Sequence, residues 1–172
     1  MKMDNELPNR KPTRLKNFDY SNNGVYFITL CTQSRKSILS KIIVGEGLPL
    51  PHLSHYGKIT EKWIQALSNQ YQEMSVLQYV IMPNHIHLLL SVRKDDGRGD
   101  PSPTVDAAMG WLKYQATKEI NKARNTAGVK VFQRSFYDHI VRNDEDYCEI
   151  YNYIYENPMR WKEDKLYTNE QK

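Results

Sequence analysis

Residues 79–92 read Tyr-Val-Ile-Met-Pro-Asn-His-Ile-His-Leu-Leu-Leu-Ser-Val, and this stretch decides the fold. Its second half is short and apolar, as expected of a strand, and the Pro-Asn pair before it is a turn signal. We therefore predict an antiparallel hairpin with strands over 74–82 and 85–92. Side chains alternate between the faces of a strand, so His85 and His87 share one face. The opposite face is apolar and is formed by Ile86, Leu88, Leu90 and Val92.

The histidine pair has two interpretations. Imidazole is the commonest metal ligand in proteins and a good general base, so two imidazoles on one face could form a reactive site. Alternatively, one histidine is structural and the other is exposed on a half-buried strand, because a His-x-His pair is a weak signal by itself. Other parts of the sequence are needed to distinguish the two interpretations.

Hydrophobic periodicity and turn residues place the other elements. Ser54, Ser102 and Asn143 are residue types that cap helices, and Pro103 suits the first position of a helix. The predicted elements are a strand over 24–33, an irregular β-hairpin over 37–51, a helix from Ser54 to about residue 71, the two hairpin strands, a helix from Ser102 and Pro103 to about residue 125, a strand over 131–141, and a helix from Asn143 to residues 157–158.

This element order predicts an α+β, ferredoxin-like fold. The order βαββαβ gives an antiparallel sheet with two helices on one face, and here an additional C-terminal helix follows. The apolar face of the strand over 85–92 must meet the two covering helices, so the histidine pair should lie on the other, free face. Residues 1–17 are expected to be a flexible basic arm, 18–161 the folded domain, and 162–172 a charged C-terminal tail.

Composition fits a single cytoplasmic domain. The chain has 172 residues, a net charge of +4 and 26% charged residues, and it shows neither an apolar run of membrane-spanning length nor a secretory signal. Cys31 and Cys148 lie far apart in apolar surroundings and fit reduced thiols better than a disulfide. The mild basicity is compatible with nucleic-acid binding without establishing it.

The last helix carries a second set of polar side chains. Tyr153 and Asn157 are four residues apart, so both can reach one point beside the helix. They lie about a quarter-turn from the apolar stripe. A phenol and a carboxamide aimed at one point suit a metal site with a tyrosine nucleophile. Tyr155 fits packing better, as do the residues of the stripe, which are Tyr147, Ile150, Tyr151 and Ile154.

Four ordered stretches of the sequence resemble one protein family. They are Tyr-Phe-Ile-Thr-Leu-Cys-Thr from residue 26, Tyr-Val-Ile-Met-Pro-Asn-His-Ile-His-Leu-Leu-Leu from residue 79, Phe-Gln-Arg-Ser-Phe-Tyr-Asp-His-Ile-Val-Arg from residue 132, and Tyr-Ile-Tyr-Glu-Asn-Pro from residue 153. The chain resembles the single-tyrosine HUH transposases of the IS200-like group, and within it the REP-associated tyrosine transposases. The likeness covers about residues 18–161.

The resemblance implies a function and a site. His85 and His87 correspond to the metal-binding pair, Tyr153 to the nucleophile, and Asn157 to the third metal ligand. The implied reaction is cleavage and rejoining of single-stranded or hairpin DNA through a 5′-phosphotyrosine intermediate, with Mg²⁺ or Mn²⁺ as the metal. Palindromic, REP-like hairpins are the implied substrates, and a monomer is favoured over a homodimer.

Further residues are weaker candidates. Asp138 and His139 precede the last helix and could support the metal ligands, although a satisfied core histidine explains the second equally well. Single basic residues could contact DNA phosphates, although they are more often plain surface. The candidates for DNA contact are Arg10, Lys11, Arg14, Lys16, Arg93, Lys94, Arg98, Lys113, Lys118 and Arg134.

Three other functions stay open from the sequence. A replication initiator or relaxase would share the chemistry, although this chain has no room for a helicase. A non-enzymatic, RRM-like single-strand binder would share the sheet order, but it predicts stacking aromatic residues on the free face, where the histidines stand. In a metal-dependent hydrolase without a covalent intermediate, Tyr153 would only pack.

Overall fold

The computed structural model describes residues 23–43, 48–93 and 104–168. Its centre is a four-stranded antiparallel sheet in the order β4-β5-β1-β6. The strands are β1 (Gly24–Cys31), β4 (Met74–Ile81), β5 (His85–Val92) and β6 (Tyr137–Val141). The hairpin of β4 and β5 predicted from the Pro-Asn turn is confirmed, and the strand order is that of the predicted ferredoxin-like arrangement.

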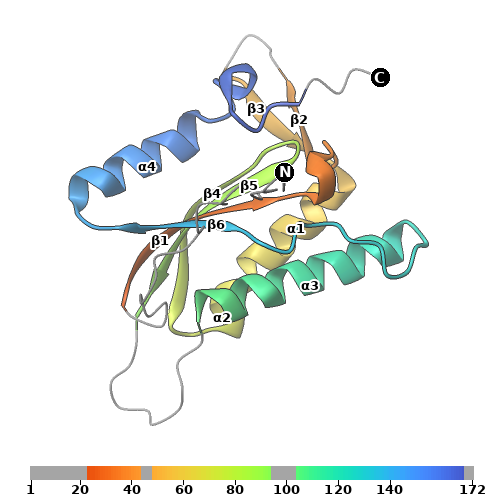
Figure 1. Ribbon diagram of the computed structural model, residues 1–172, viewed down its shortest axis with the longest axis horizontal. Coiled ribbons are helices and arrows are strands. Elements are labelled where there is room, and N and C mark those ends of the chain that lie inside the picture. Colours follow the sequence, from red (N-terminus) through yellow and green to blue (C-terminus); the bar gives the residue numbers. More distant parts are fainter. Residues whose placement is uncertain (1–22, 44–47, 94–103, 169–172) are drawn as a thin grey trace, which may run out of the picture.

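Three helices cover one face of the sheet, namely α1 (His55–Gln65), α2 (Leu67–Gln70) and α3 (Val105–Ala123) (Figure 1). The predicted apolar face of β5 meets them, because Ile86, Leu88 and Leu90 are completely buried in the main hydrophobic core. Opposite them on β1 lie Leu30, Ile28 and Tyr26, which are buried in the same core. The period of two read from the sequence therefore assigns the faces of the sheet correctly.

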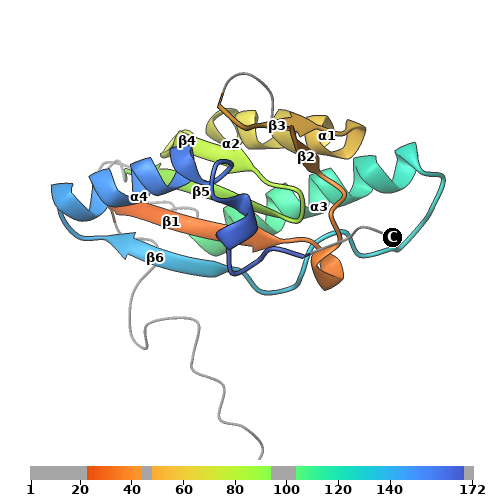
Figure 2. The same cartoon turned by 90° about the horizontal axis from the view of Figure 1, so that it is seen from above.

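The second face of the sheet is covered by α4 (Asp144–Glu156) (Figure 2). The expectation that this face is free was wrong, because Ile154 of α4 is buried in a second, smaller core. The sheet contributes Phe27, Val80, Met82 and Leu89 to that core. The predicted cap of α4 is confirmed, since the side chain of Asn143 accepts a hydrogen bond of 2.8 Å from the backbone N–H of Asp146.

A small hairpin stands beside the sheet, as expected from residues 37–51. It consists of β2 (Ser40–Ile43) and β3 (Leu50–Leu53). The helix predicted over 54–71 is broken at Ala66 into α1 and α2, and Ser54 caps α1 by accepting from Gly57 N–H. A Cβ built on Gly57 would lie 2.0 Å from the carbonyl oxygen of Leu39. Only glycine lets α1 pass so close to that backbone.

Two boundaries differ from the prediction. The N-cap of α3 is Thr104, whose side chain accepts from Ala107 N–H, while Ser102 lies outside the described residues. Of the strand predicted over 131–141, only Tyr137–Val141 forms a ladder with β1. Earlier in the predicted strand, Phe132 forms an isolated antiparallel β-bridge with Thr32, and its side chain is buried in the main core. Packing of apolar side chains therefore produced the strand-like pattern there, and the hydrogen-bond ladder does not extend to it.

Among the described residues, no helix is both long and apolar enough to cross a membrane.

Candidate functional site

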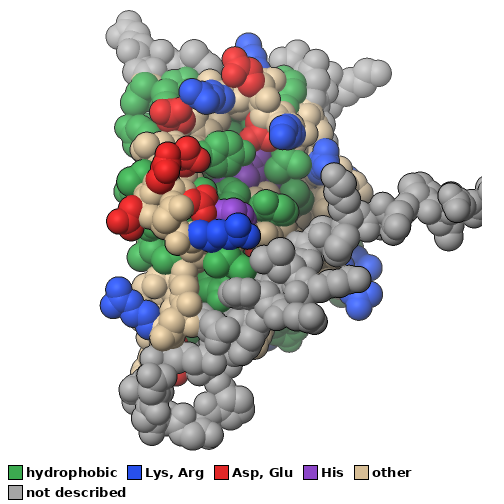
Figure 3. Space-filling view, turned by 60° about the vertical axis from the view of Figure 1, so that its left-hand side comes forward, with side chains coloured by type: hydrophobic (Ala, Val, Ile, Leu, Met, Phe, Trp, Pro, Cys, Tyr) green, Lys and Arg blue, Asp and Glu red, His purple; other side chains and the backbone are tan. Residues whose placement is uncertain are grey.

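A cavity of about 1160 Å³ opens on the α4 side of the sheet. Its walls come from β1, from the loop before β6, from α4 and from the segment after α4, and His87 and Tyr153 both line it. Figure 3 shows histidine side chains recessed among hydrophobic ones on one face, with acidic and basic side chains around them. Elements far apart in the sequence thus meet around one polar site.

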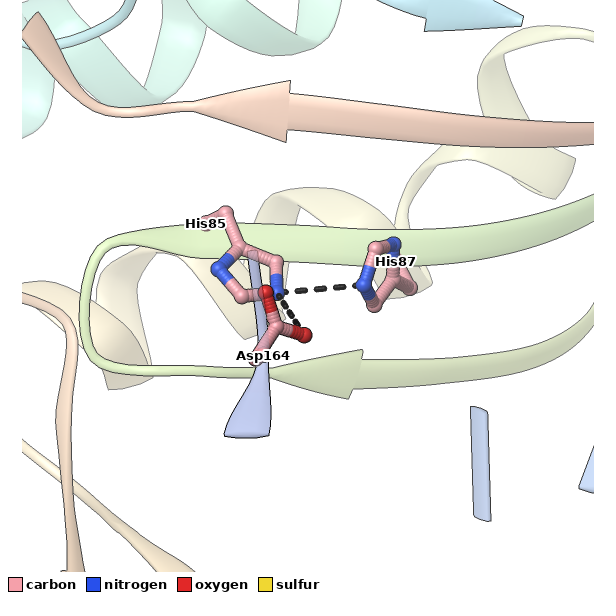
Figure 4. A group of neighbouring side chains, drawn as sticks. All are labelled: His85, His87 and Asp164. Carbon is pink, nitrogen blue, oxygen red and sulfur yellow. Dashed lines mark hydrogen bonds and ion pairs between the residues drawn. The ribbon is translucent and has the colours of Figure 1, made fainter. Parts of the chain in front are cut away.

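The two histidines of β5 lie side by side beneath α4. His85 is completely buried and His87 is 3% exposed. Their Nε2 atoms face each other at 3.1 Å (Figure 4). Strand alternation accounts for the shared face, and burial beneath α4 accounts for the loss of contact with solvent.

Hydrogen bonds at Nδ1 orient both imidazole rings. Asn84 donates through Nδ2 to the carbonyl of Leu166 at 2.8 Å, so its Oδ1 must be the atom 2.8 Å from His85 Nδ1. A carboxamide oxygen only accepts, and therefore His85 carries its proton on Nδ1. Thr29 Oγ1 lies 2.9 Å from Nδ1 of His87, and its hydroxyl can either donate to that atom or accept from it. The Nε2 atom of His85 is therefore left with a free lone pair, and that of His87 has one in the tautomer in which Thr29 accepts.

Burial keeps both imidazoles neutral. It lowers the pKa of His85 to about 4, against the opposing effect of the nearby Asp164 charge. Burial, followed by the proximity of His85, places the pKa of His87 well below its usual range. In the tautomer in which both Nε2 lone pairs face each other, the two imidazoles repel unless a cation lies beside them. A metal ion requires neutral imidazole nitrogen atoms that are already oriented, so the histidine pair fits a metal ion.

Asp164 completes the group, and sequence reasoning missed it. One of its carboxylate oxygens lies 4.0 Å from His85 Nε2, and one ligand atom from each of His85, His87 and Asp164 lies within 4.8 Å of the others. Asn157 Nδ2 donates to Asp164 Oδ2 at 2.9 Å, and the N–H of Leu166 donates to Oδ1. The residue belongs to the segment predicted as a charged tail, whose described part lies beside the histidines, with Asp164 near His85 and the Leu166 carbonyl bound by Asn84. No periodicity in that segment signals this contact.

Asn157 lies at the same place, as expected from its spacing after Tyr153. The side chain is 2% exposed, and its Oδ1 atom is buried without a hydrogen-bond partner. An orphaned buried oxygen is costly unless an ion or a ligand satisfies it. Asn157 and Asp164 are therefore two candidate oxygen ligands beside the two imidazoles, and the resemblance implied only the first.

Tyr153 reaches the histidine pair from α4. Its hydroxyl lies 3.3 Å from His87 Nε2, and its ring packs edge-on against Phe27 with ring centroids 5.9 Å apart. The residue is 44% exposed, so the phenol remains open to the cavity. Partial burial raises the pKa of Tyr153 to about 12, and the negative charge of Asp164 adds to the effect. The phenol is thus protonated at neutral pH.

The two supporting candidates lie elsewhere. Asp138 pairs with Ile28 on β1 and therefore points to the face opposite the site. His139 is on the α4 face, but its Nε2 lies 2.9 Å from a carboxylate oxygen of Asp146 in the first turn of α4. His139 thus anchors the helix that carries Tyr153, while Asp138 lies on the other face of the sheet from the histidine pair.

The basic candidates for DNA contact are scattered. Lys113 donates to the backbone carbonyl of Arg134 at 2.6 Å, which gives it a structural partner. Lys118 is exposed on α3, the helix that covers the opposite face of the sheet. Arg93 follows the end of β5 remote from His85, and Arg134 is exposed in the loop that lines the cavity. The remaining candidates lie outside the described residues, and they are Arg10, Lys11, Arg14, Lys16, Lys94 and Arg98.

Comparison with known proteins identifies the family. The model of the family described as "Transposase IS200 like" matches residues 20–157. The chain belongs to the IS200-like transposase family. This family is one of enzymes, and the match runs from before β1 to the end of α4, so it includes the histidine pair and Tyr153.

Two relatives come from Haemophilus influenzae. One, named only "Uncharacterized protein", is 28% identical over 178 residues, which covers 95% of this chain and 96% of the relative. The other is named "Putative REP-associated tyrosine transposase" and is 27% identical over 150 residues, covering 83% of this chain and 74% of the relative. The resemblance stated from the sequence motifs is confirmed by these matches.

A solved structure shares the fold. It is titled as a REP-associated tyrosine transposase bound to a REP hairpin, and it matches with a TM-score of 0.56 and 18% sequence identity. The match covers 86% of this chain and 73% of the other. The predicted α+β fold, an antiparallel sheet with helices, is thus confirmed as the fold of this transposase.

Proposed function

We propose that this transposase cleaves and rejoins single-stranded or hairpin DNA with Tyr153 as the nucleophile. The observation that carries the proposal is the position of the Tyr153 hydroxyl, 3.3 Å from His87 Nε2 at the edge of an open cavity. A relative named as a REP-associated tyrosine transposase, and a structure of such a protein bound to a REP hairpin, support palindromic hairpins as the substrate class.

The reaction is a transesterification at phosphorus. The phenolic oxygen of Tyr153 forms a bond to the phosphorus, the bond from phosphorus to the 3′ oxygen breaks, and that oxygen leaves as a 3′-hydroxyl after taking up a proton. The 5′ end stays attached as a phosphotyrosine. Because the pKa of Tyr153 is raised to about 12, the phenol has to give up its proton during the attack. A phosphate ester persists throughout, so the 3′-hydroxyl can reverse the step without ATP.

A divalent ion fits the group formed by His85, His87 and Asp164, with the free oxygen of Asn157 beside it. Mg²⁺ and Mn²⁺ are the ions we propose, since carboxylate and amide oxygens suit both. Such an ion would polarise the scissile phosphate and offset the negative charge on its oxygens. The protein supplies two oriented imidazoles for it and shields them from water beneath α4.

The test is covalent capture. Incubation of the protein with a labelled hairpin oligonucleotide and Mn²⁺, followed by denaturing electrophoresis, should show label on the wild-type protein. Tyr153→Phe should abolish the adduct and retain the fold and DNA binding, because the ring and its packing survive. The matched control is Tyr155→Phe, on the same helix with a side chain that is 59% exposed. It should form the adduct normally.

Two outcomes would contradict the proposal. An adduct that persists in Tyr153→Phe and disappears in Tyr155→Phe would place the nucleophile on the outer face of α4. Absence of any adduct from the wild-type protein, with retained hairpin binding, would favour a non-enzymatic binding module.

A further inference from the structure

The turn after β1 brings an arginine to the cavity in an unusual backbone conformation. It is the 3-10 turn Gln33–Arg35, and both Ser34 and Arg35 have positive φ angles, of 57° and 54°. Residues other than glycine rarely adopt this left-handed conformation, and two in succession are rarer still. Such strain persists only where the surroundings fix it, and it gathers at functional sites.

The turn is fixed to the same residue that orients His85. Buried Thr32 donates its backbone N–H to the carbonyl of Asn84 at 2.9 Å, and its hydroxyl lies 3.0 Å from that carbonyl and 2.8 Å from the carbonyl of Lys36. Asn84 in turn holds Nδ1 of His85. Next to Thr32, the N–H of Gln33 donates to Val131 at 2.7 Å. The position of Arg35 is thereby tied to that of the histidine pair.

The side chain of Arg35 lines the cavity together with His87, Tyr153 and Asp164. Within the described ranges, its guanidinium forms neither a side-chain hydrogen bond nor an ion pair. Its charge is nevertheless felt at the site, because it lowers the pKa of Cys31, which burial raises, and Cys31 is the residue opposite His85 in the sheet. Arg160, which also lines the cavity, differs in being paired with Glu156 at 3.2 Å.

We propose that the Arg35 guanidinium binds the non-bridging oxygens of the phosphodiester that Tyr153 attacks. The inference rests on the proposed function and names the group that holds its substrate. Guanidinium presents a planar pair of N–H donors that matches two phosphate oxygens, and its charge stays fixed at any pH of interest. A donor already in place when negative charge grows on those oxygens stabilises the transition state more than the bound substrate.

The experiment compares two DNA substrates. One is a hairpin oligonucleotide with a normal scissile phosphodiester, located first with the wild-type protein, and the other carries an uncharged methylphosphonate at that position. Arg35→Gln should slow adduct formation at saturating DNA by ~10²-fold on the normal substrate. On the methylphosphonate, the same variant should lie within about threefold of wild type, because the charge that Arg35 binds is gone. Arg160→Gln is the matched control, and it should stay within about twofold of wild type on both substrates.

Each possible result either supports or overturns the role proposed for Arg35. If Arg35→Gln reacts as fast as wild type, the inference fails, while the Tyr153 adduct and the proposed function stand. An equal loss on both substrates would assign Arg35 a structural role and would also overturn the inference. A wild-type protein without any adduct refutes the proposed function and this inference together. Should Arg35→Gln melt at a lower temperature, Arg35→Lys replaces it, since it keeps the charge but loses the paired donors, and a wild-type rate in that variant would overturn the inference.

Discussion

Asp164→Asn should weaken Mn²⁺ binding by at least about 30-fold. The carboxylate lies 4.0 Å from His85 Nε2, and the two side chains are 5% and 0% exposed. An ion bound between His85 and Asp164 would lie within about 4 Å of the carboxylate, and at 4 Å a divalent cation and one negative charge attract by about 2 kcal/mol even with the full screening of water, which is ~30-fold in affinity. Burial reduces the screening, so this value is a lower limit. Asparagine keeps the shape of the side chain and can still accept from Asn157.

Titration calorimetry with Mn²⁺ measures the effect, and Glu163→Gln is the matched control. It removes the same charge from the neighbouring residue, which is exposed and outside the ligand group. A second readout is the ultraviolet titration of Tyr153 without metal. Because the negative charge of Asp164 contributes to the raised pKa of Tyr153, its removal should lower that pKa. If Asp164→Asn and Glu163→Gln bind Mn²⁺ equally well, the carboxylate is not a ligand, and the amide oxygen of Asn157 takes its place.

Two further predictions concern stability. Gly57→Ala should destabilise the protein by about 1–3 kcal/mol in a urea titration, because the new Cβ would collide with the Leu39 carbonyl. The higher helix propensity of alanine offsets up to ~1 kcal/mol of this loss. Gly110→Ala, with open space around the new Cβ, should instead stabilise the protein by about 0.8–1 kcal/mol in the same titration. The hydrogen bond from His139 lowers the pKa of Asp146, so its stabilising effect is present above the unfolded-state pKa of about 3.9 and is lost as the pH falls through the folded-state value. Asp146→Asn should therefore be less stable than wild type near neutral pH and equally stable in strong acid, and a constant difference would disprove this linkage.

The sequence was informative where a short repeat determines geometry. Alternation along β5 was enough to place His85 and His87 on one face, and the spacing of four residues was enough to bring Tyr153 and Asn157 to one side of α4. Both arguments depend only on local backbone geometry. The covering of the second sheet face depends instead on whether Ile154 finds apolar partners on β1, β4 and β5, and the βαββαβ order, which does not include the last helix, predicts that this face is free.

Asp164 illustrates what could not be predicted. Residues 161–168 have no apolar periodicity, and the contacts that bring them to the histidine pair are with residues some eighty positions away, such as that of Asn84 with the Leu166 carbonyl. Nothing in the local composition distinguishes a solvated charged segment from one that is held in place by distant hydrogen bonds. Likewise, Phe132 and Phe136 gave a strand-like pattern because they fill the main core, although β1 offers no ladder to them.

The two layers on either side of the sheet differ in the apolar side chains that hold them. Among the described residues, twenty-two buried side chains join α1, α2 and α3 to the sheet in the main core, whereas the cluster that includes Ile154 of α4 has five. Elements with few buried apolar contacts open locally at a lower free energy than the global unfolding of the domain. We therefore expect α4, with the tyrosine that it carries, to open at a lower free energy than the main core, and amide hydrogen exchange should then show weaker protection in α4 than in the sheet.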